Sequence, residues 1–138
     1  MKAMLLAAGA GTRLRPYTDH VPKCMLPIAG KPLLEHTIMH LQQQGVTEIV
    51  INVCALPQVI MDHFGSGERW GVCIRYSVEA TQLGTAGGVK RMADFFAGAP
   101  FLVWYGDNLS RCNVGQLYAS HVARGSVATL ALFHREDV

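Results

Sequence analysis

Short apolar runs, separated by segments with helical spacing, organise the chain. Residues 4–8 are continuously apolar and are followed by glycine, which is typical of a central strand buried on both faces. Residues 48–53 predict a second buried strand, and residues 72–78 alternate as a third strand would. Two further strands are predicted at "FLVWYGDN" (101–108) and at "VATLALF" (127–133).

Apolar residues at helical spacing predict a helix over residues 32–45. Leu34, Ile38 and Leu41 fall on one face of this helix and form a stripe that is expected to be buried. Further helices are predicted at residues 57–65, 84–96 and 113–125, the last with Asn113 as its N-cap.

Strands and helices thus alternate along 138 residues, which is the length of one domain. This order predicts an α/β fold in which helices cover both faces of a mostly parallel sheet. The chain stops just past its last predicted strand, where such a sheet is expected to continue. We therefore expect either a fragment or an unusually short, truncated member of its class.

The composition changes the picture by pointing to partners. Apolar residues make up 50% of the chain and charged residues only 16%, against about 25% charged residues in a typical domain. An interface, such as one in a homo-oligomer, or a missing remainder is therefore expected. The net charge of +2, without any basic run, argues against a nucleic acid or a membrane surface as the partner.

The cysteines and the apolar stretches indicate the compartment. The four cysteines are far apart and form no C-x-x-C pair, so they signal neither zinc nor a redox dithiol. No stretch approaches the roughly 20 apolar residues of a membrane span, and the first apolar run is short for a secretory signal. The expected localisation is cytoplasmic, with reduced thiols.

The loop over residues 9–23 is rich in glycine, proline and cations, and it matches neither of two common nucleotide motifs. A dinucleotide fingerprint would need a third glycine where Leu14 stands. In "MLPIAGKP", the phosphate-cradling G-x-x-x-x-G-K-[ST] motif fails because Met25 replaces its first glycine and Pro32 its hydroxyl residue.

The residue types of this loop nevertheless suit a polyphosphate. Gly9 and Gly11 let the backbone approach a ligand closely and turn N–H groups toward phosphate oxygens. Arg13 and Lys23 add two cations that suit a ligand whose charge shifts during reaction. The alternative is a solvated turn that carries ordinary surface cations.

The longer string "LAAGAGTRLRPYTDHVPKCMLPIAGKPLLEH" (6–36) resembles the N-terminal signature of the sugar-phosphate nucleotidyltransferases. The later segments "LGTAGG" (83–88) and "WYGDN" (104–108) are similar to two further motifs of that family. The resemblance implies a Rossmann-like three-layer sandwich. It also implies joining of a nucleoside triphosphate to a sugar 1-phosphate, with Mg²⁺, to give a nucleotide sugar and pyrophosphate. Residues 1–138 would be the N-terminal, nucleotide-binding part of the domain, without the C-terminal sugar-binding part.

The same resemblance implies roles for individual residues, with no protein nucleophile. Arg13 would stabilise charge on the departing pyrophosphate, Lys23 would contact the phosphates and align the sugar phosphate, and Asp107 would ligate Mg²⁺. The implied catalytic residues are thus Arg13, Lys23 and Asp107. The implied nucleotide-binding residues are Leu6, Ala7, Ala8, Gly9, Gly11, Thr12, Arg13, Gln82, Gly84 and Thr85.

The base and the sugar are predicted from weaker patterns. "E-x-x-x-L-G-T-A-G" (79–87) is similar to the pattern of mannose-1-phosphate guanylyltransferases, whereas "GDN" also occurs in thymidylyltransferase relatives. We expect GTP with a mannose-like phosphate. The alternatives are a nucleotide-binding half-domain with little or no catalysis, and a half-domain that acts by pairing its sheet edge with another copy or a partner chain.

Several conspicuous residues are predicted to have no chemical role. His36 and His40 are four residues apart, but they fall opposite the apolar stripe and are expected to face solvent rather than bind metal. Cys24 lies beside Lys23 and is treated as incidental, because the expected chemistry needs no thiol.

Overall fold

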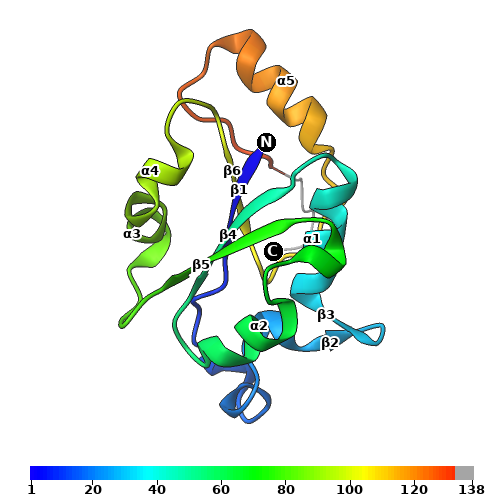
Figure 1. Cartoon of the computed structure of the whole chain (residues 1–138), viewed down its shortest axis with the longest axis vertical. Coiled ribbons are helices and arrows are strands. Elements are labelled where there is room, and N and C mark those ends of the chain that lie inside the picture. Colours follow the sequence, from blue (N-terminus) through cyan, green and yellow to red (C-terminus); the bar gives the residue numbers. More distant parts are fainter. Residues whose placement is uncertain (133–138) are drawn as a thin grey trace.

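Four strands form one sheet in the computed structural model, which describes residues 1–132 (Figure 1). The order is β5-β4-β1-β6 and all three pairings are parallel. Numbered along the chain, these are the third, second, first and fourth strands of the sheet. The direction in which strands are added therefore reverses between β1 and β6. In open α/β sheets, ligands bind at such a reversal, beyond the carboxyl ends of the strands. The strands are β1 (Lys2–Leu6), β4 (Glu48–Val53), β5 (Cys73–Val78) and β6 (Leu102–Tyr105).

Helices cover both faces of the sheet, with α1 and α2 on one face and α3 and α4 on the other (Figure 1). The predicted stripe of Leu34, Ile38 and Leu41 is fully buried in the larger core. A smaller core around Met4 and Phe96 fills the opposite face. The predicted three-layer α/β class is confirmed. The helices are α1 (Leu33–Gln43), α2 (Pro57–Phe64), α3 (Gly84–Arg91), α4 (Ala93–Phe96) and α5 (Val114–Arg124).

The connection between β1 and α1 contains short turns and a small hairpin rather than a plain loop. Thr12–Leu14, Tyr17–Asp19 and Lys23–Met25 each form a 3-10 turn, and a fourth such turn, Glu68–Trp70, precedes β5. β2 (Pro27–Ile28) and β3 (Lys31–Pro32) pair antiparallel. These turns bring Lys23 back toward the carboxyl ends of the strands.

Two of the differences from the sequence expectation have a local cause. The first strand ends at Leu6 rather than at residue 8, because the Ala7 N–H donates to the side chain of Asn52. The helix predicted over residues 84–96 is two helices, since the backbone leaves helical geometry at Met92 (φ −106°, ψ 20°).

The strand predicted at residues 127–133 is wrong for residues 127–132, and Phe133 lies outside the described residues. Residues 127–132 carry no strand hydrogen bonding, and Val127, Leu130 and Leu132 are among the most exposed apolar side chains. An apolar sequence raises strand propensity, but a strand also needs a neighbour that pairs its backbone groups. Among residues 1–132 the only strand beside β6 is β1, so the outer edge of β6 has no partner there.

Residues 1–132 include no helix that is both long enough and apolar enough to cross a membrane. Cys24, Cys54, Cys73 and Cys112 are all free thiols.

Candidate active site

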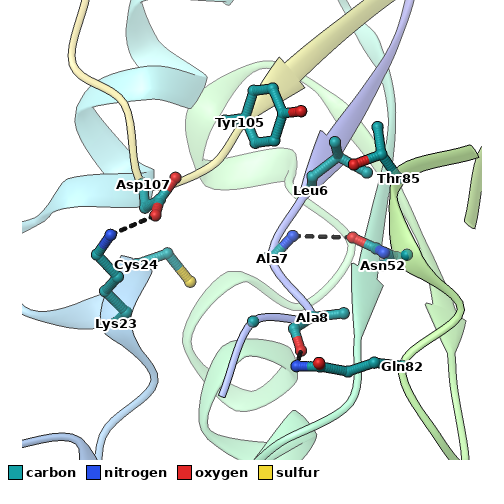
Figure 2. A pocket seen from close by; sticks show the side chains of 12 residues that line it. Leu6, Ala7, Ala8, Lys23, Cys24, Asn52, Gln82, Thr85, Tyr105 and Asp107 are labelled. Atoms are coloured by element: carbon teal, nitrogen blue, oxygen red, sulfur yellow. Dashed lines mark hydrogen bonds and ion pairs between the residues drawn. The ribbon is translucent and has the colours of Figure 1, made fainter. Parts of the chain in front are cut away.

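A cavity of about 210 Å³ opens beyond the carboxyl ends of β1, β4 and β6 (Figure 2). It lies at the reversal of the sheet order, where a ligand crevice is expected. The segment that follows β1 forms one wall, the start of α3 a second, and the segments around Lys23 and Asp107 the far end. Its lining residues are Leu6, Ala7, Ala8, Gly9, Lys23, Cys24, Asn52, Gln82, Gly84, Thr85, Tyr105 and Asp107.

The segment after β1 is held by side chains from two other parts of the chain. The Ala7 N–H donates to Asn52 Oδ1 over 2.8 Å, and Gln82 Nε2 donates to the Ala8 carbonyl over 2.6 Å (Figure 2). A Cβ on Gly9 would meet no protein atom within 4 Å, so internal packing does not require glycine there. The absence of a side chain leaves that part of the cavity open to a ligand.

Gly11 has a different physical reason. Its φ of +63° lies in the left-handed region, and a Cβ there would come within 3.0 Å of Thr18 Cγ2 and 3.3 Å of Lys23 Cβ. The Thr18 hydroxyl donates to the Gly11 carbonyl over 2.8 Å. Gly11 therefore closes the loop on itself, and through this closure it sets the position of Lys23.

Gly11, Thr12 and Arg13 do not line the cavity. Thr12 and Arg13 belong to an exposed 3-10 turn at the tip of the loop. Arg13 makes no hydrogen bond or ion pair with the part of the chain that the structure describes. Its guanidinium is therefore free to meet an anion that extends out of the cavity.

Lys23 and Asp107 form an ion pair at the far end of the cavity. Lys23 Nζ lies 2.5 Å from Asp107 Oδ2, and their side chains are 37% and 32% exposed (Figure 2). Gly106 brings Asp107 close to β1: its N–H donates to the Leu6 carbonyl over 2.9 Å, and a Cβ there would lie 3.0 Å from that oxygen. One cation and one acid thus stand at the cavity end, both partly open to solvent.

Cys24 lines the same end but is buried. The pKa of the Cys24 thiol is raised to about 12, chiefly because the thiol is buried; a hydrogen bond from the Cys24 backbone lowers this pKa, and the nearby Asp107 carboxylate raises it by a smaller amount. The thiol therefore stays protonated at neutral pH, and it is a poor nucleophile.

Comparison with known proteins identifies the family. A family model described as nucleotidyl transferase matches residues 2–138. The chain belongs to the nucleotidyl transferase family. The resemblance drawn from the loop signature is thereby confirmed, and the family is one of enzymes that transfer nucleotidyl groups.

Individual relatives are sugar-phosphate nucleotidyltransferases. An N-acetylmuramate alpha-1-phosphate uridylyltransferase of Neisseria meningitidis is 50% identical over 80% of this chain and 48% of its own length. A UTP–glucose-1-phosphate uridylyltransferase of Synechocystis is 40% identical over 94% of this chain and 36% of its own length. This nucleotidyl transferase chain therefore spans less than half of either relative.

A solved structure shares the fold. A crystal structure assigned to a glucose-1-phosphate thymidylyltransferase from Bacillus anthracis superposes with a TM-score of 0.81 at 29% identity, over 90% of this chain and 50% of that chain. The nucleotide-sugar transferase type of the α/β fold is thus confirmed.

The structure brings most of the predicted nucleotidyltransferase residues to one cavity and adds three. Cys24, Asn52 and Tyr105 line the cavity but were not predicted. Asn52 carried a signal, since it is the one polar residue in the otherwise apolar run from Ile49 to Val53. Tyr105 immediately precedes the predicted Gly106-Asp107 pair and is placed at the cavity by the end of β6.

Part of the histidine prediction is wrong. The Nε2 atoms of His36 and His40 lie 2.8 Å from the Ile28 carbonyl and 3.0 Å from the Cys112 carbonyl, respectively. Both histidines are partly buried rather than fully facing solvent, and His40 packs against Trp104 because the segment after β6 covers that side of α1. No three His, Cys, Asp or Glu residues gather as a metal site within residues 1–132.

Proposed function

We propose that this chain binds a nucleoside triphosphate in the cavity and provides the nucleotide half of a sugar-1-phosphate nucleotidyltransferase site. The supporting observation is the cavity at the point where the strand order reverses. The segment that follows β1, with Gly9, forms one end of this cavity, and the Lys23–Asp107 pair forms the other. The base and ribose would lie between residues 7–9 and 82–85. The triphosphate would run toward Lys23 and the tip of the loop.

In the proposed reaction, an oxygen of the sugar 1-phosphate attacks the α-phosphorus of the nucleotide. A new P–O bond forms there, the bond from the α-phosphorus to the oxygen bridging to the β-phosphorus breaks, and pyrophosphate leaves with that oxygen. No covalent bond to the protein is made, so the protonated thiol of Cys24 has no role. The protein supplies position and positive charge, with Lys23 at the attacking phosphate and Arg13 at the departing pyrophosphate.

The donor set at the cavity end fits Mg²⁺. This ion is usually held by one or two carboxylates together with phosphates and waters, and Asp107 places one carboxylate at the cavity. When bound, Mg²⁺ would neutralise phosphate charge. Lys23 now pairs with the same carboxylate, and it would have to release Asp107 in favour of the phosphates.

UTP is the first candidate nucleotide, because the two relatives described above are uridylyltransferases by name. GTP with a mannose-like 1-phosphate is the second candidate, supported by the similarity of "E-x-x-x-L-G-T-A-G" (79–87) to the guanylyltransferase pattern. The sugar is selected by contacts to its hydroxyl groups, so a panel of sugar 1-phosphates is needed to assign it.

Binding is tested first, by the melting temperature of the chain with UTP or GTP and Mg²⁺. We expect one nucleotide to raise it, and the rise to shrink in Lys23→Ala but not in Lys90→Ala, which removes the same charge from an exposed site outside the cavity. No rise with either nucleotide would refute the proposed function.

Catalysis is tested next, by pyrophosphate release with a panel of sugar 1-phosphates. Release that depends on the sugar phosphate and is lost in Asp107→Asn, but kept in the exposed Asp94→Asn control, supports the transferase. Binding without release from any sugar phosphate would instead support the half-domain that binds nucleotide without turnover.

A further inference from the structure

A chain of hydrogen bonds runs beneath the cavity and joins its two walls. The Ala7 N–H donates to Asn52 Oδ1 (2.8 Å), Asn52 Nδ2 donates to Glu79 Oε1 (2.9 Å), and the Leu83 N–H donates to Glu79 Oε2 (3.0 Å). Asn52 and Glu79 are each 3% exposed. This hydrogen-bond chain therefore links the segment after β1, the end of β4 and the turn that opens α3.

The direction of each hydrogen bond in this chain is fixed by chemistry. The two backbone N–H groups at its ends can only donate, so Asn52 must turn its oxygen toward Ala7 and its NH₂ toward Glu79. Glu79 in turn must offer an acceptor on both sides. No other orientation of the Asn52 amide satisfies all three bonds.

Helix α3 packs directly on the Asn52 and Glu79 side chains of this hydrogen-bond chain. A Cβ added at Gly88 would lie 2.9 Å from Asn52 Nδ2 and 3.0 Å from Glu79 Oε1. Such distances are too short for an alanine, so glycine is required for the helix to rest against the two side chains. The position of α3, whose first residues line the cavity, is thus coupled to the Asn52–Glu79 pair.

We infer that Asn52 and Glu79 are positioning residues for the nucleotide, an inference that rests on the proposed function. They hold the backbone of residues 7–9 and the start of α3 at a fixed separation, and that separation sets the width of the slot for base and ribose. Glu79 does not line the cavity, so it acts only through the groups that it holds. Loss of the pair should weaken nucleotide binding without removing any direct contact of Glu79 with the ligand.

Glu79→Gln breaks the hydrogen-bond chain while keeping the shape of the side chain. Glutamine offers one oxygen and one NH₂, so its NH₂ faces either Asn52 Nδ2 or the Leu83 N–H, both of which donate. If the Asn52 amide turns over in response, its NH₂ then faces the Ala7 N–H instead. One bond is lost in every arrangement.

Asn52→Asp combined with Glu79→Gln restores the chain with its polarity reversed. The aspartate accepts from the Ala7 N–H and from the glutamine NH₂, and the glutamine oxygen accepts from the Leu83 N–H. Asn52→Asp alone instead places two carboxyl groups against each other. The two single variants should therefore be impaired and the double variant rescued.

Ser77→Ala is the matched control. Ser77 is the register partner of Asn52 on the neighbouring strand, is equally buried, and its hydroxyl has no partner among the described residues. Removing that hydroxyl changes the same layer of the sheet without breaking a bond of the chain.

The experiment is isothermal titration calorimetry of the full chain with UTP and with GTP, in Mg²⁺. We expect the dissociation constant to rise about tenfold in each single variant, to return to within about threefold of the wild type in the double variant, and to stay unchanged in Ser77→Ala. The fitted number of sites should stay near one per chain. A merely structural role would lower the number of sites and leave the dissociation constant unchanged.

Other outcomes overturn the inference in distinguishable ways. Wild type that binds neither nucleotide refutes the proposed function, and the inference falls with it. Wild type that binds, with Glu79→Gln binding equally well or with a double variant as impaired as the single ones, refutes only the positioning role. Amide exchange at Ala7 and Leu83 without nucleotide provides a separate check: at least one of the two should exchange faster in Glu79→Gln, and both should exchange at wild-type rates in the double variant.

Discussion

The two sides of the cavity are held together by different numbers and kinds of contacts. The tied wall, defined as residues 7–9 and 82–85 with Asn52 and Glu79, is held by four hydrogen bonds. The charged rim, defined as Arg13, Lys23 and Asp107, contains a single ion pair that is about one-third exposed.

This difference matches two tasks in the proposed reaction. A base and ribose keep their charge and shape throughout, so the wall that holds them gains from being fixed in advance. The phosphates gain, lose and redistribute charge, so the cations that attend them need freedom to change partner. A weak, partly solvated ion pair permits that exchange at little cost to the fold.

The charged rim should therefore give the largest effect on function and the smallest on stability. We expect Lys23→Ala to lower the rate of nucleotidyl transfer about 100-fold or more, as loss of a charge-stabilising donor commonly does. Its free energy of unfolding should change by less than about 1 kcal/mol, because the ion pair is partly solvated. Pyrophosphate release and urea unfolding measure the two quantities, with Lys90→Ala as the matched control. A stability loss equal to that of a tied-wall variant would break the comparison.

The tied wall should behave in the opposite way in urea. Asn52→Ala leaves the Ala7 N–H and one Glu79 oxygen buried without a partner, which should lower the free energy of unfolding by about 1–3 kcal/mol. Ser77→Ala removes a hydroxyl that has no partner among residues 1–132, so it should leave stability unchanged or slightly raised. Equal losses in both variants would show that burial, rather than the hydrogen-bond chain, carries the stability.

Two glycines sharpen the comparison: Gly9 belongs to the tied wall, and Gly88 packs against its Asn52 and Glu79 side chains. Gly88→Ala forces a methyl group onto Asn52 and Glu79 and should cost about 1–3 kcal/mol of stability. Gly9→Ala meets no protein atom within 4 Å, so unfolding should change by less than about 0.5 kcal/mol. Its nucleotide affinity should nevertheless fall, because the methyl group points into space that the ligand needs. Urea unfolding and calorimetry check both expectations, and unimpaired binding by Gly9→Ala would place the nucleotide elsewhere.

The parts of the molecule that were predicted correctly depend on local sequence. Three strands of the sheet were predicted from short apolar runs and β5 from alternating apolar and polar residues. Lys23 and Asp107 came from motifs read in order along the chain. Asn52 and Glu79 were missed because their role exists only where three separate segments meet. The strand predicted over residues 127–133 failed over 127–132 for a related reason, since pairing depends on a neighbour that local propensity does not supply.

Gly11 shows a subtler limit of sequence reasoning. Its glycine was expected to admit a ligand, but the structure uses it to fold the loop against Thr18 and Lys23. A glycine motif records only that a side chain is excluded. Whether the excluding group is a ligand or the protein itself becomes clear only when the neighbouring atoms are placed.

Cys24 lines the cavity beside Lys23 of the charged rim and is buried, so its ionisation tests whether solvent reaches this end of the cavity. Because its folded pKa is raised to about 12, while an unfolded cysteine ionises near 9.0, the unfolded state loses its proton first as pH rises. Stability linked to Cys24 is therefore complete below the unfolded pKa and falls as pH rises toward the folded one, by about 1.4 kcal/mol at pH 10 relative to neutral pH. Cys24→Ala should flatten this part of the curve in urea unfolding at pH 8 and pH 10, whatever its stability at pH 8. Tyr76, whose pKa burial also raises to about 12, contributes a smaller alkaline loss that stays in both chains. If stability falls with pH equally steeply in wild type and Cys24→Ala, the thiol is solvated. The cavity end beside Lys23 would then be open to solvent at Cys24 as well as at the Lys23–Asp107 ion pair.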